Sequence, residues 1–394
     1  MNILQVCSAM SLGGGERHVI DLTRALIERG HRLHLAIRPG SPLRAALAGW
    51  PVTFHELPLR NSLDLPSIWQ LARLIRRERI DVLHAHVGRD YIVCGLAARL
   101  NPSVRYLVTR HHFNPFRPFW PFRLGGPNQR SRSNPLLAWA LARAEHLIAV
   151  SATVRDRFLA AFPPLATRVT IIPNWVDPDL YLPGDRAKAR QALGITRPLA
   201  IAIIGQISPL KGQHIFVESA LELLAEARAA RAASRQPDSP FEFLIIGSAD
   251  QADQPFAAGL RGRIAAAGET SAIRFIGFVE DLQARLAGLD LVVILSENEA
   301  FSLVLIESMA AGRPVIATRV GGIAEILRDR QTGLFIDRSA AALTAALKEL
   351  RDDPTLRHQL GERARDEVRA RFSREKVITR LELLLTGSPI PGPD

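Results

Sequence analysis

Two glutamates, Glu299 and Glu307, stand eight positions apart in the stretch SENEAFSLVLIESMAAGRPVIATRVGG at residues 296–322. The residues between them are Ala, Phe, Ser, Leu, Val, Leu and Ile. A solvated helix face would instead carry charges of both signs at spacings of three and four. We therefore interpret the two carboxylates as placed for binding or catalysis. The alternative from this stretch alone is that Glu307 complements a helix dipole and Glu299 caps a helix.

The position of these acids after a predicted strand indicates what they could bind. The run LVVILS predicts a buried strand, and a helix is predicted over roughly 301–311. Ligands of parallel sheets bind beyond the carboxyl ends of the strands. The free N–H groups at the helix start, near Phe301 to Leu303, predict a phosphate site. Glu307 would then lie roughly 8 Å along the axis and accept hydrogen bonds from a ribose diol, with Glu299 at the other end of the ligand.

A lysine follows another predicted strand, in IIGQISPLKGQH at 203–214. Only four of the 50 basic residues are lysines, and Lys211 stands beside a glycine in a strand-to-helix loop. Its ammonium could act as a point charge on a diphosphate, and Gln206 could add a hydrogen bond but no charge. The alternative is a solvated loop lysine.

A glycine-rich loop follows the first predicted strand, in SLGGGERH. Gly13, Gly14 and Gly15 let the backbone approach a ligand closely before a helix starts. The pattern is not GxGxxG, and the second strand ends in Arg38 where a dinucleotide site would need an acid. We therefore do not expect a dinucleotide here.

Histidines gather after the next strands, in DVLHAHVGRD and VTRHHFN. His84 and His86 share one side of a predicted strand, and Arg110, His111 and His112 end the following one. A His-x-His pair is a weak zinc signal, and no Asp, Glu or Cys stands beside it at usable spacing. We expect no metal, a role for His84 in the core or in support of a site residue, and a cleft role for His86.

Strand-like runs alternate with amphipathic helical segments along the whole chain, which predicts an α/β fold with parallel sheets covered on both faces. Seven strand-like runs precede a Pro, Asp and Gly cluster at 174–185, and six follow it. We therefore predict two doubly wound, Rossmann-like domains joined near this cluster.

Composition narrows the class of protein. The chain has 394 residues, 47% of them hydrophobic, and no run of 18 apolar residues, so we expect a cytoplasmic protein that spans no membrane. We found no secretory leader in the first residues. Cys7 and Cys94 lie in apolar settings and are interpreted as reduced core residues.

The net positive charge of the chain comes from its first half. Residues 1–180 hold 23 Lys and Arg against 12 Asp and Glu, whereas residues 181–394 hold 27 of each. Within the first half, the acid-free segment 113–132 is rich in Phe and Trp and suits an anionic membrane surface. Its alternative is a basic loop folded over the core. The arginines of this segment are Arg117, Arg123, Arg130 and Arg132.

The stretch ENEAFSLVLIESMAAGRPVIATRVGGIAEIL, preceded by GQISPLKG and NWVD and opened by GGGE, resembles the retaining glycosyltransferases of family four. The resemblance covers nearly the whole chain and implies the GT-B fold, in which two Rossmann-like domains face a cleft. It implies an N-terminal acceptor domain at 1–178 completed by a returning C-terminal helix at 373–387, a donor domain at 179–372, and a tail at 388–394.

Site residues follow from the same resemblance. Glu307 would bind the nucleotide ribose, Lys211 the diphosphate, and Glu299 would lie near the transferred sugar with His86 beside its ring. Gln206 stands where most members have Arg, which removes one phosphate charge. The residues implied in donor binding are Gly14, Gly15, Gly205, Gln206, Lys211, Ala300, Phe301, Ser302, Leu303 and Glu307; those implied in catalysis are His86, Glu299 and Lys211. We assign Gly13, Arg110, His111 and His112 to the acceptor.

The function expected is transfer of a hexose-like sugar from a nucleotide diphosphate sugar to a hydroxyl of a lipid-linked or lipopolysaccharide-type acceptor, with retention. A front-face reaction without metal or other cofactor is favoured, because Lys211 and two helix starts stabilise the diphosphate. A double displacement would need a nucleophile such as Glu16 or Asp90. The alternatives are a nucleotide-sugar epimerase and a non-catalytic, membrane-binding basic module. Nucleic acid is not an expected partner, because no recognised motif accompanies the charge.

Overall fold

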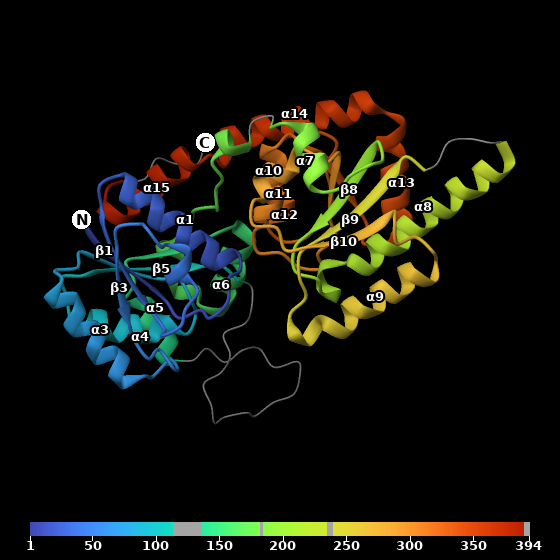
Figure 1. Cartoon of the computed structure of the whole chain (residues 1–394). Coiled ribbons are helices and arrows are strands. Elements are labelled where there is room, and N and C mark those ends of the chain that lie inside the picture. The colour runs from blue at the N-terminus through green and yellow to red at the C-terminus, as the bar shows by residue number, and fades with distance from the viewer. Residues whose placement is uncertain (113–134, 182–183, 235–238, 390–394) are drawn as a thin grey trace. The chain divides into compact units, whose positions relative to one another are not determined.

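The chain folds into two α/β units, each built on a parallel sheet (Figure 1). The computed structural model describes residues 1–112, 135–181, 184–234 and 239–389. One unit comprises Met1–Asn174 with Glu375–Asp394, and the other comprises Trp175–Arg374. The limits expected from the sequence, at 178 and 372, lie a few residues away. The proposed membrane segment 113–132 lies outside the described residues.

The N-terminal unit contains a seven-stranded parallel sheet in the order β3-β2-β1-β4-β5-β6-β7. The chain starts in the middle of the sheet, builds one half outward, crosses over and builds the other half. Such an order leaves the carboxyl ends of β1 and β4 as neighbours at the switch point. The strands are β1 Asn2–Cys7, β2 Arg32–Ile37, β3 Val52–Glu56, β4 Val82–Ala85, β5 Arg105–Arg110, β6 His146–Ala149 and β7 Val169–Ile171.

Helices cover both faces of this sheet, and alternate strand residues separate the two cores. On one face, Leu4 and Val6 pack with the helices after β3, β4, β5 and β6. On the other, Cys7 and Leu35 pack with the first two helices. The helices are α1 Gly14–Glu28, α2 Leu43–Ala46, α3 Leu65–Arg77, α4 Asp90–Arg99, α5 Pro135–Ala142 and α6 Ala152–Ala161. Cys7 and Cys94 are buried and free, as expected.

The last helix, α15 (Arg374–Thr386), packs on the N-terminal unit. Arg29 at the end of α1 donates to Glu382 at 2.5 Å and to Glu375 at 2.9 Å. Arg105 donates to the carbonyl oxygens of Leu384 and Leu385 at the end of α15. The prediction that the C-terminal helix returns to the first domain is therefore confirmed.

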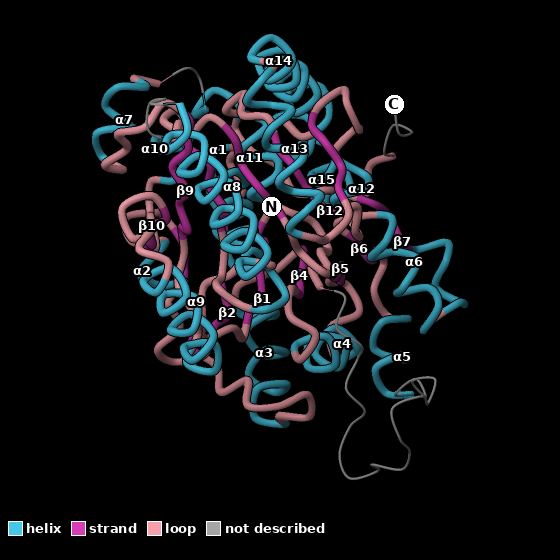
Figure 2. The backbone as a smooth tube through the Cα atoms, turned by 90° about the vertical axis from the view of Figure 1, so that its right-hand side faces the viewer, coloured by secondary structure: helices cyan, strands magenta, loops and turns pink. Residues whose placement is uncertain are grey.

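The C-terminal unit repeats the architecture with six parallel strands in the order β10-β9-β8-β11-β12-β13. Figure 2 labels β9, β10 and β12 of this sheet. Its strands are β8 Leu199–Ile204, β9 Phe241–Ile246, β10 Ile273–Gly277, β11 Leu291–Ile294, β12 Val315–Thr318 and β13 Gly333–Ile336. Its helices are α7 Arg186–Ala192, α8 Gln213–Ser234, α9 Gln254–Ala266, α10 Leu282–Leu286, α11 Leu303–Ala310, α12 Ile323–Ile326, α13 Ala340–Asp352 and α14 Pro354–Arg371. Every predicted strand-like run is a strand, so the predicted fold class is confirmed.

One predicted helix boundary is wrong. The helix expected at roughly 301–311 begins at Leu303, because Ser302 takes an extended conformation and caps it. Its hydroxyl accepts a hydrogen bond from the N–H of Leu305 at 3.2 Å. The free N–H groups at this helix start therefore lie about two residues further along the chain than expected. No helix in the described part of the chain is long and apolar enough to cross a membrane.

Candidate functional site

The loops after β8 and β11 bring Lys211 and Glu299 together in the C-terminal unit. The Lys211 ammonium donates to Glu299 Oε2 at 2.5 Å, and the Ser296 hydroxyl donates to the same oxygen at 3.1 Å. Both strands end at the same edge of the sheet, where parallel strands place their ligands. The structure therefore joins two residues that lie 88 positions apart, both of which the sequence had marked as candidates.

Glycine makes this arrangement possible at two places. Gly212, directly after Lys211, has φ +77°, and a Cβ there would lie 2.6 Å from Leu295 of the facing loop. Gly322 donates its N–H to the carbonyl oxygen of Glu299 at 2.8 Å, and a Cβ on it would overlap the Ala300 carbonyl. The loop carrying Glu299 is thus held against the glycines after β12. The Gly-Gly pair 321–322 is the sequence signal that could have predicted this contact.

Glu307 is a buried carboxylate and not a surface acid. It is 2% exposed in α11, and the Tyr181 hydroxyl donates to its Oε1 at 3.2 Å. Because Glu307 is the fifth residue of α11, it lies beyond the first turn, where helix-dipole acids are found. Ser302, not Glu299, caps this helix. The structural alternatives that the sequence left open for both acids are therefore wrong.

Gln206 points its amide toward acids. Its Nε2 donates to Asp250 at 2.8 Å and to Asp253 at 3.4 Å. Gly205 before it has φ +140°. The position at which the resemblance implies an arginine thus holds a neutral amide that is bound to carboxylates of the loop after β9.

In the N-terminal unit, the glycine loop leads into α1. Gly13 is the N-cap residue, and Glu16 accepts its N–H at 2.9 Å. Asp90, at the start of α4, is fully buried and accepts the N–H of Ser8 at 2.9 Å. Burial raises the pKa of Asp90 to about 6, against the effect of this hydrogen bond. The two acids considered as nucleophiles therefore both bond to the backbone of the loop after β1.

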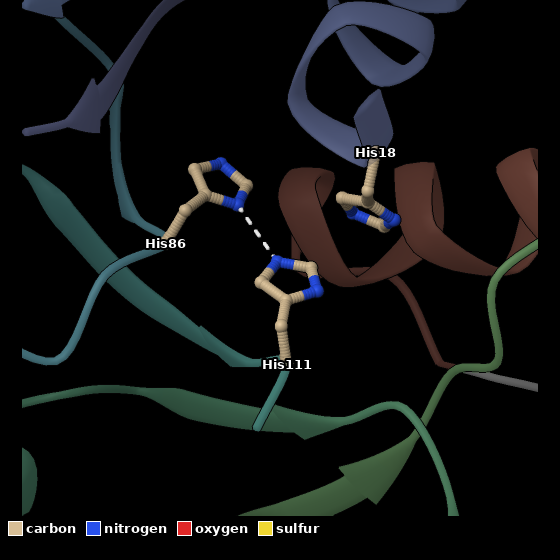
Figure 3. A group of neighbouring side chains, drawn as sticks. All are labelled: His18, His86 and His111. Atoms are coloured by element: carbon tan, nitrogen blue, oxygen red, sulfur yellow. Dashed lines mark hydrogen bonds between the residues drawn. The ribbon is translucent and has the colours of Figure 1, made fainter. Parts of the chain in front are cut away.

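Three histidines from separate elements converge beside this loop (Figure 3). His18 comes from α1, His86 follows β4 and His111 follows β5. His86 Nδ1 and His111 Nε2 are 3.5 Å apart, and the rings of His18 and His111 are 4.6 Å apart. Gly15 lies against the same group, because a Cβ there would be 3.6 Å from His111. The sequence predicted His86 and His111 as site residues and missed His18.

These imidazoles are neutral at physiological pH. Burial lowers the pKa of His18 to about 4, against the effect of its hydrogen bond to Asn174. Burial, together with the neighbouring histidines, holds the pKa values of His86 and His111 well below the ordinary value. His18 Nδ1 faces the amide oxygen of Asn174 at 2.9 Å and therefore carries the hydrogen. His18 Nε2 is then a hydrogen-bond acceptor directed toward the group.

His84 lies behind the group as a core residue, as expected. It is fully buried, its Nε2 lies 2.7 Å from the Thr109 hydroxyl, and its ring is 4.1 Å from that of His86. Arg110 ends β5 near Gly88, and His112 is exposed beside His111. The predicted acceptor residues thus lie at one edge of the N-terminal sheet.

The histidine group also has the composition of a metal site. The facing nitrogens of His18, His86 and His111 all lie within 4.8 Å of one another, and neutral imidazole is a common zinc ligand. The sequence gave only the weak His-x-His signal, because His18 lies in α1, far along the chain from His86 and His111. Among the described residues this is the one cluster of three or more such side chains.

Solved structures with the same fold place the architecture in a known class. The structure of Anabaena Alr3699/HepE in complex with UDP matches with a TM-score of 0.83 at 21% identity, covering 98% of this chain and all of that one. WaaG, a glycosyltransferase involved in lipopolysaccharide biosynthesis, matches with a TM-score of 0.70 at 17% identity over 98% of this chain. The two doubly wound parallel sheets and these matches define the fold as GT-B.

Sequence comparisons give the family. Residues 12–180 match the model of Glycosyltransferase Family 4, and residues 185–367 match that of Glycosyl transferases group 1. A D-inositol 3-phosphate glycosyltransferase of Arthrobacter sp. is 32% identical over 83% of this chain and 76% of its own length. An N-acetyl-alpha-D-glucosaminyl L-malate synthase of Bacillus anthracis is 25% identical over 95% and 94%. The chain belongs to the family-four, group 1 glycosyltransferases.

Proposed function

We propose that this glycosyltransferase moves a hexose-like sugar, with retention, from a nucleotide diphosphate sugar to a hydroxyl of a lipid-linked or cell-envelope glycan acceptor. The observation that carries the donor assignment is the convergence of Lys211 and Glu299 beside the start of α11, with the buried Glu307 in the same helix. HepE, which shares the fold, has been crystallised with UDP and with UDP-glucose.

Each donor group has a matching partner in the C-terminal unit. The Lys211 ammonium, now paired with Glu299, would exchange that carboxylate for the diphosphate. The N–H groups of Leu303 and Val304 open α11, and the N-terminus of a helix favours anions. Glu307 would accept from the ribose hydroxyls, while Tyr181 holds its carboxylate in place.

A front-face reaction fits the residues better than a double displacement does. The bond between the anomeric carbon and the diphosphate oxygen breaks, and the acceptor oxygen bonds from the same face. The acceptor proton passes to the departing diphosphate, whose charge Lys211 and the α11 start stabilise. Glu16 and Asp90 already bind the backbone of the β1–α1 loop, which disfavours either as a nucleophile.

The histidine group serves the sugars as neutral hydrogen-bonding groups in this proposal. His86 Nε2 and His111 Nδ1 make no hydrogen bond within the described part of the chain, although both are buried. Buried polar atoms of this kind are normally satisfied, and sugar hydroxyls would do so. Because the imidazoles are neutral, they can both donate and accept. No metal is required in this scheme.

The acceptor class has a specific rival. The malate and inositol 3-phosphate in the names of two relatives are small anions, and the positive excess of residues 1–180 would also attract such molecules. We favour the envelope acceptor because the sequence of segment 113–132 combines four arginines with Phe and Trp and contains no acid, a composition that small soluble acceptors do not need.

A panel of labelled UDP-, GDP- and ADP-sugars tests the proposal. Each is incubated with no acceptor, with malate or inositol phosphate, and with an envelope lipid extract. Transfer with retained anomeric configuration to a lipid-extracted product supports the proposal. Transfer only to the small anions would overturn the acceptor assignment, and conversion of the donor sugar into its epimer without acceptor would indicate the epimerase alternative.

A further inference from the structure

An exposed tryptophan and leucine stand on the outer side of α3. Trp69 is 62% exposed and Leu65 is 70% exposed, one turn apart on the same face. The inner side of the helix is well packed, with Leu71, Leu74 and Ile75 in the core. The exposed pair is therefore not required to hold α3 in place, and its large apolar surface is left uncovered in the described structure.

Arginines continue the exposed surface of Leu65 and Trp69 along α3. Arg73 lies 5.5 Å from the Trp69 ring in a cation–π contact, and Arg76 and Arg77 follow in the next turn. Arg76 donates to Asn101 Oδ1 and to the Leu100 carbonyl oxygen, each at 2.8 Å. These bonds fasten the C-terminal end of α4 to α3.

The end of α4 continues the surface. Arg99 is exposed and Leu100 is 50% exposed, directly beside Arg76. Both views show α3 and α4 side by side (Figures 1 and 2), and α4 packs between α3 and α5. We call the set Leu65, Trp69, Arg73, Arg76, Arg99 and Leu100 the α3 surface.

Acidic side chains are nearly absent from this part of the unit. The only acid within the helices α3, α4 and α5 is Asp90, which is fully buried. The two acids that flank α3 are occupied, because Asp64 is buried as the helix cap and Glu78 pairs with Arg77 at 2.8 Å. The α3 surface therefore offers net positive charge around an apolar centre.

We propose that the α3 surface docks the N-terminal unit on an anionic lipid bilayer. Tryptophan and leucine enter the headgroup boundary, where amphipathic rings are favoured, while the arginines bind lipid phosphates. An anionic protein would satisfy the arginines equally well, but the cluster of Trp69, Leu65 and Leu100 with arginine stems around it fits the boundary between headgroups and acyl chains. The inference deepens the envelope-acceptor proposal and rests on it for the choice of a membrane as partner.

Vesicle flotation of the full-length protein tests this docking. Vesicles are phosphatidylcholine alone or with about a third phosphatidylglycerol, at low ionic strength and in about 0.5 M NaCl. Binding is expected only with the anionic lipid, and it is expected to fall in high salt. Replacing Arg73 and Arg99 with Gln should lower the partition coefficient roughly 25-fold, since each arginine changes it about fivefold. Trp69→Ser with Leu65→Ser should abolish the binding that remains in salt.

A matched control makes the same chemical changes in the other unit. Phe278 is 75% exposed and Arg263 is exposed, so Phe278→Ser with Arg263→Gln removes an exposed aromatic and a cation without touching the α3 surface. This variant should float like the unaltered protein. All variants should retain their melting temperature, because the substituted side chains are exposed. The α3 variants should also retain donor hydrolysis, because none of their substituted residues belongs to the C-terminal unit.

Three outcomes would overturn the inference. In the first, the α3 variants float normally, while replacing the four arginines of segment 113–132 with Ser abolishes flotation; membrane docking would then stand and the α3 surface would not. In the second, no variant of the protein binds anionic vesicles at all. In the third, Trp69→Ser abolishes a concentration-dependent dimer seen by light scattering, with no vesicle binding. Absence of donor hydrolysis in every variant and in the unaltered protein would instead count against the proposed function.

Discussion

The contact between Lys211 and Glu299 yields the sharpest test of the donor site. Removing the ammonium with Lys211→Met takes away a charge-assisted hydrogen bond to the diphosphate, which is worth about 1.5 to 3 kcal/mol. That loss alone weakens binding of a nucleoside diphosphate roughly 10- to 150-fold. In addition, the substitution leaves the Glu299 carboxylate, which now lies 2.5 Å from the ammonium, without its counter-charge.

Because the Glu299 carboxylate then lacks its counter-charge, Lys211→Met should weaken binding more than loss of the hydrogen bond alone would. Two negative charges about 5 Å apart repel by about 3 kcal/mol at the effective dielectric of a protein surface. We therefore expect Lys211→Met to lose more than roughly 1,000-fold in affinity. The double variant Lys211→Met with Glu299→Gln should bind at least tenfold more tightly than Lys211→Met alone.

Titration calorimetry with UDP, or with whichever nucleoside diphosphate the donor panel selects, measures this directly. Binding is preferred to turnover because Glu299 is also proposed to lie near the transferred sugar. The control is Lys348→Met, which breaks the ion pair to Glu226 on α8 at the same kind of distance, 2.7 Å. Folded Lys211→Met protein with unchanged affinity would refute the phosphate assignment, and a double variant no better than the single one would refute the repulsion argument.

Three further results are expected. Tyr181→Phe removes the hydrogen bond to Glu307 and should raise the donor KM roughly 3- to 10-fold with kcat nearly unchanged; equal loss in kcat would show that Tyr181 acts in the transition state. EDTA should not reduce activity, whereas micromolar zinc should inhibit by binding His18, His86 and His111, and His18→Ala should relieve that inhibition; activity that vanishes in EDTA and returns with magnesium would contradict the metal-free scheme. Asp90→Asn should raise the melting temperature at pH 8 and have little effect at pH 3. Burial raises the folded-state pKa of Asp90 to about 6, so its ionisation destabilises the fold by up to about 3 kcal/mol as pH rises through 4 to 6. An equal change at both pH values would show that ionisation of Asp90 is not the cause.

Much of the architecture could be predicted because it depends on local sequence patterns. Buried parallel strands are near-continuous runs of Val, Ile and Leu, and the thirteen runs predicted from the sequence are the thirteen strands of the described residues. Once parallel sheets are expected, the residues after each strand become the candidates. This rule, together with the rarity of lysine and the apolar surroundings of Glu299, selected Lys211, Glu299 and His86. Glu307 was recognisable as a charge in the middle of an apolar helix.

Contacts between distant segments could not be predicted in this way. Tyr181 and Glu307 are 126 positions apart, and His18 and Asn174 are 156 apart, so no periodicity or spacing links them. Tyr181 follows closely in the sequence after Asn174, where the chain passes from the first unit to the second. His18 lies on the buried side of an ordinary amphipathic helix. The start of α11 was misplaced for a local reason, because Ser302 can either continue a helix or cap it, and tertiary packing selects the cap.

The return of α15 to the N-terminal unit has a consequence for synthesis of the protein. Arg29, His31 and Arg105 bind a helix that the ribosome makes about 200 residues after Asn174. At roughly 5 to 20 residues per second, the first domain must wait about 10 to 40 s for its last helix. During that interval the side of α1 that α15 will cover is exposed on the nascent chain. The domain made first is therefore finished last, and a chain cut short before α15 would release a first domain with that side still uncovered.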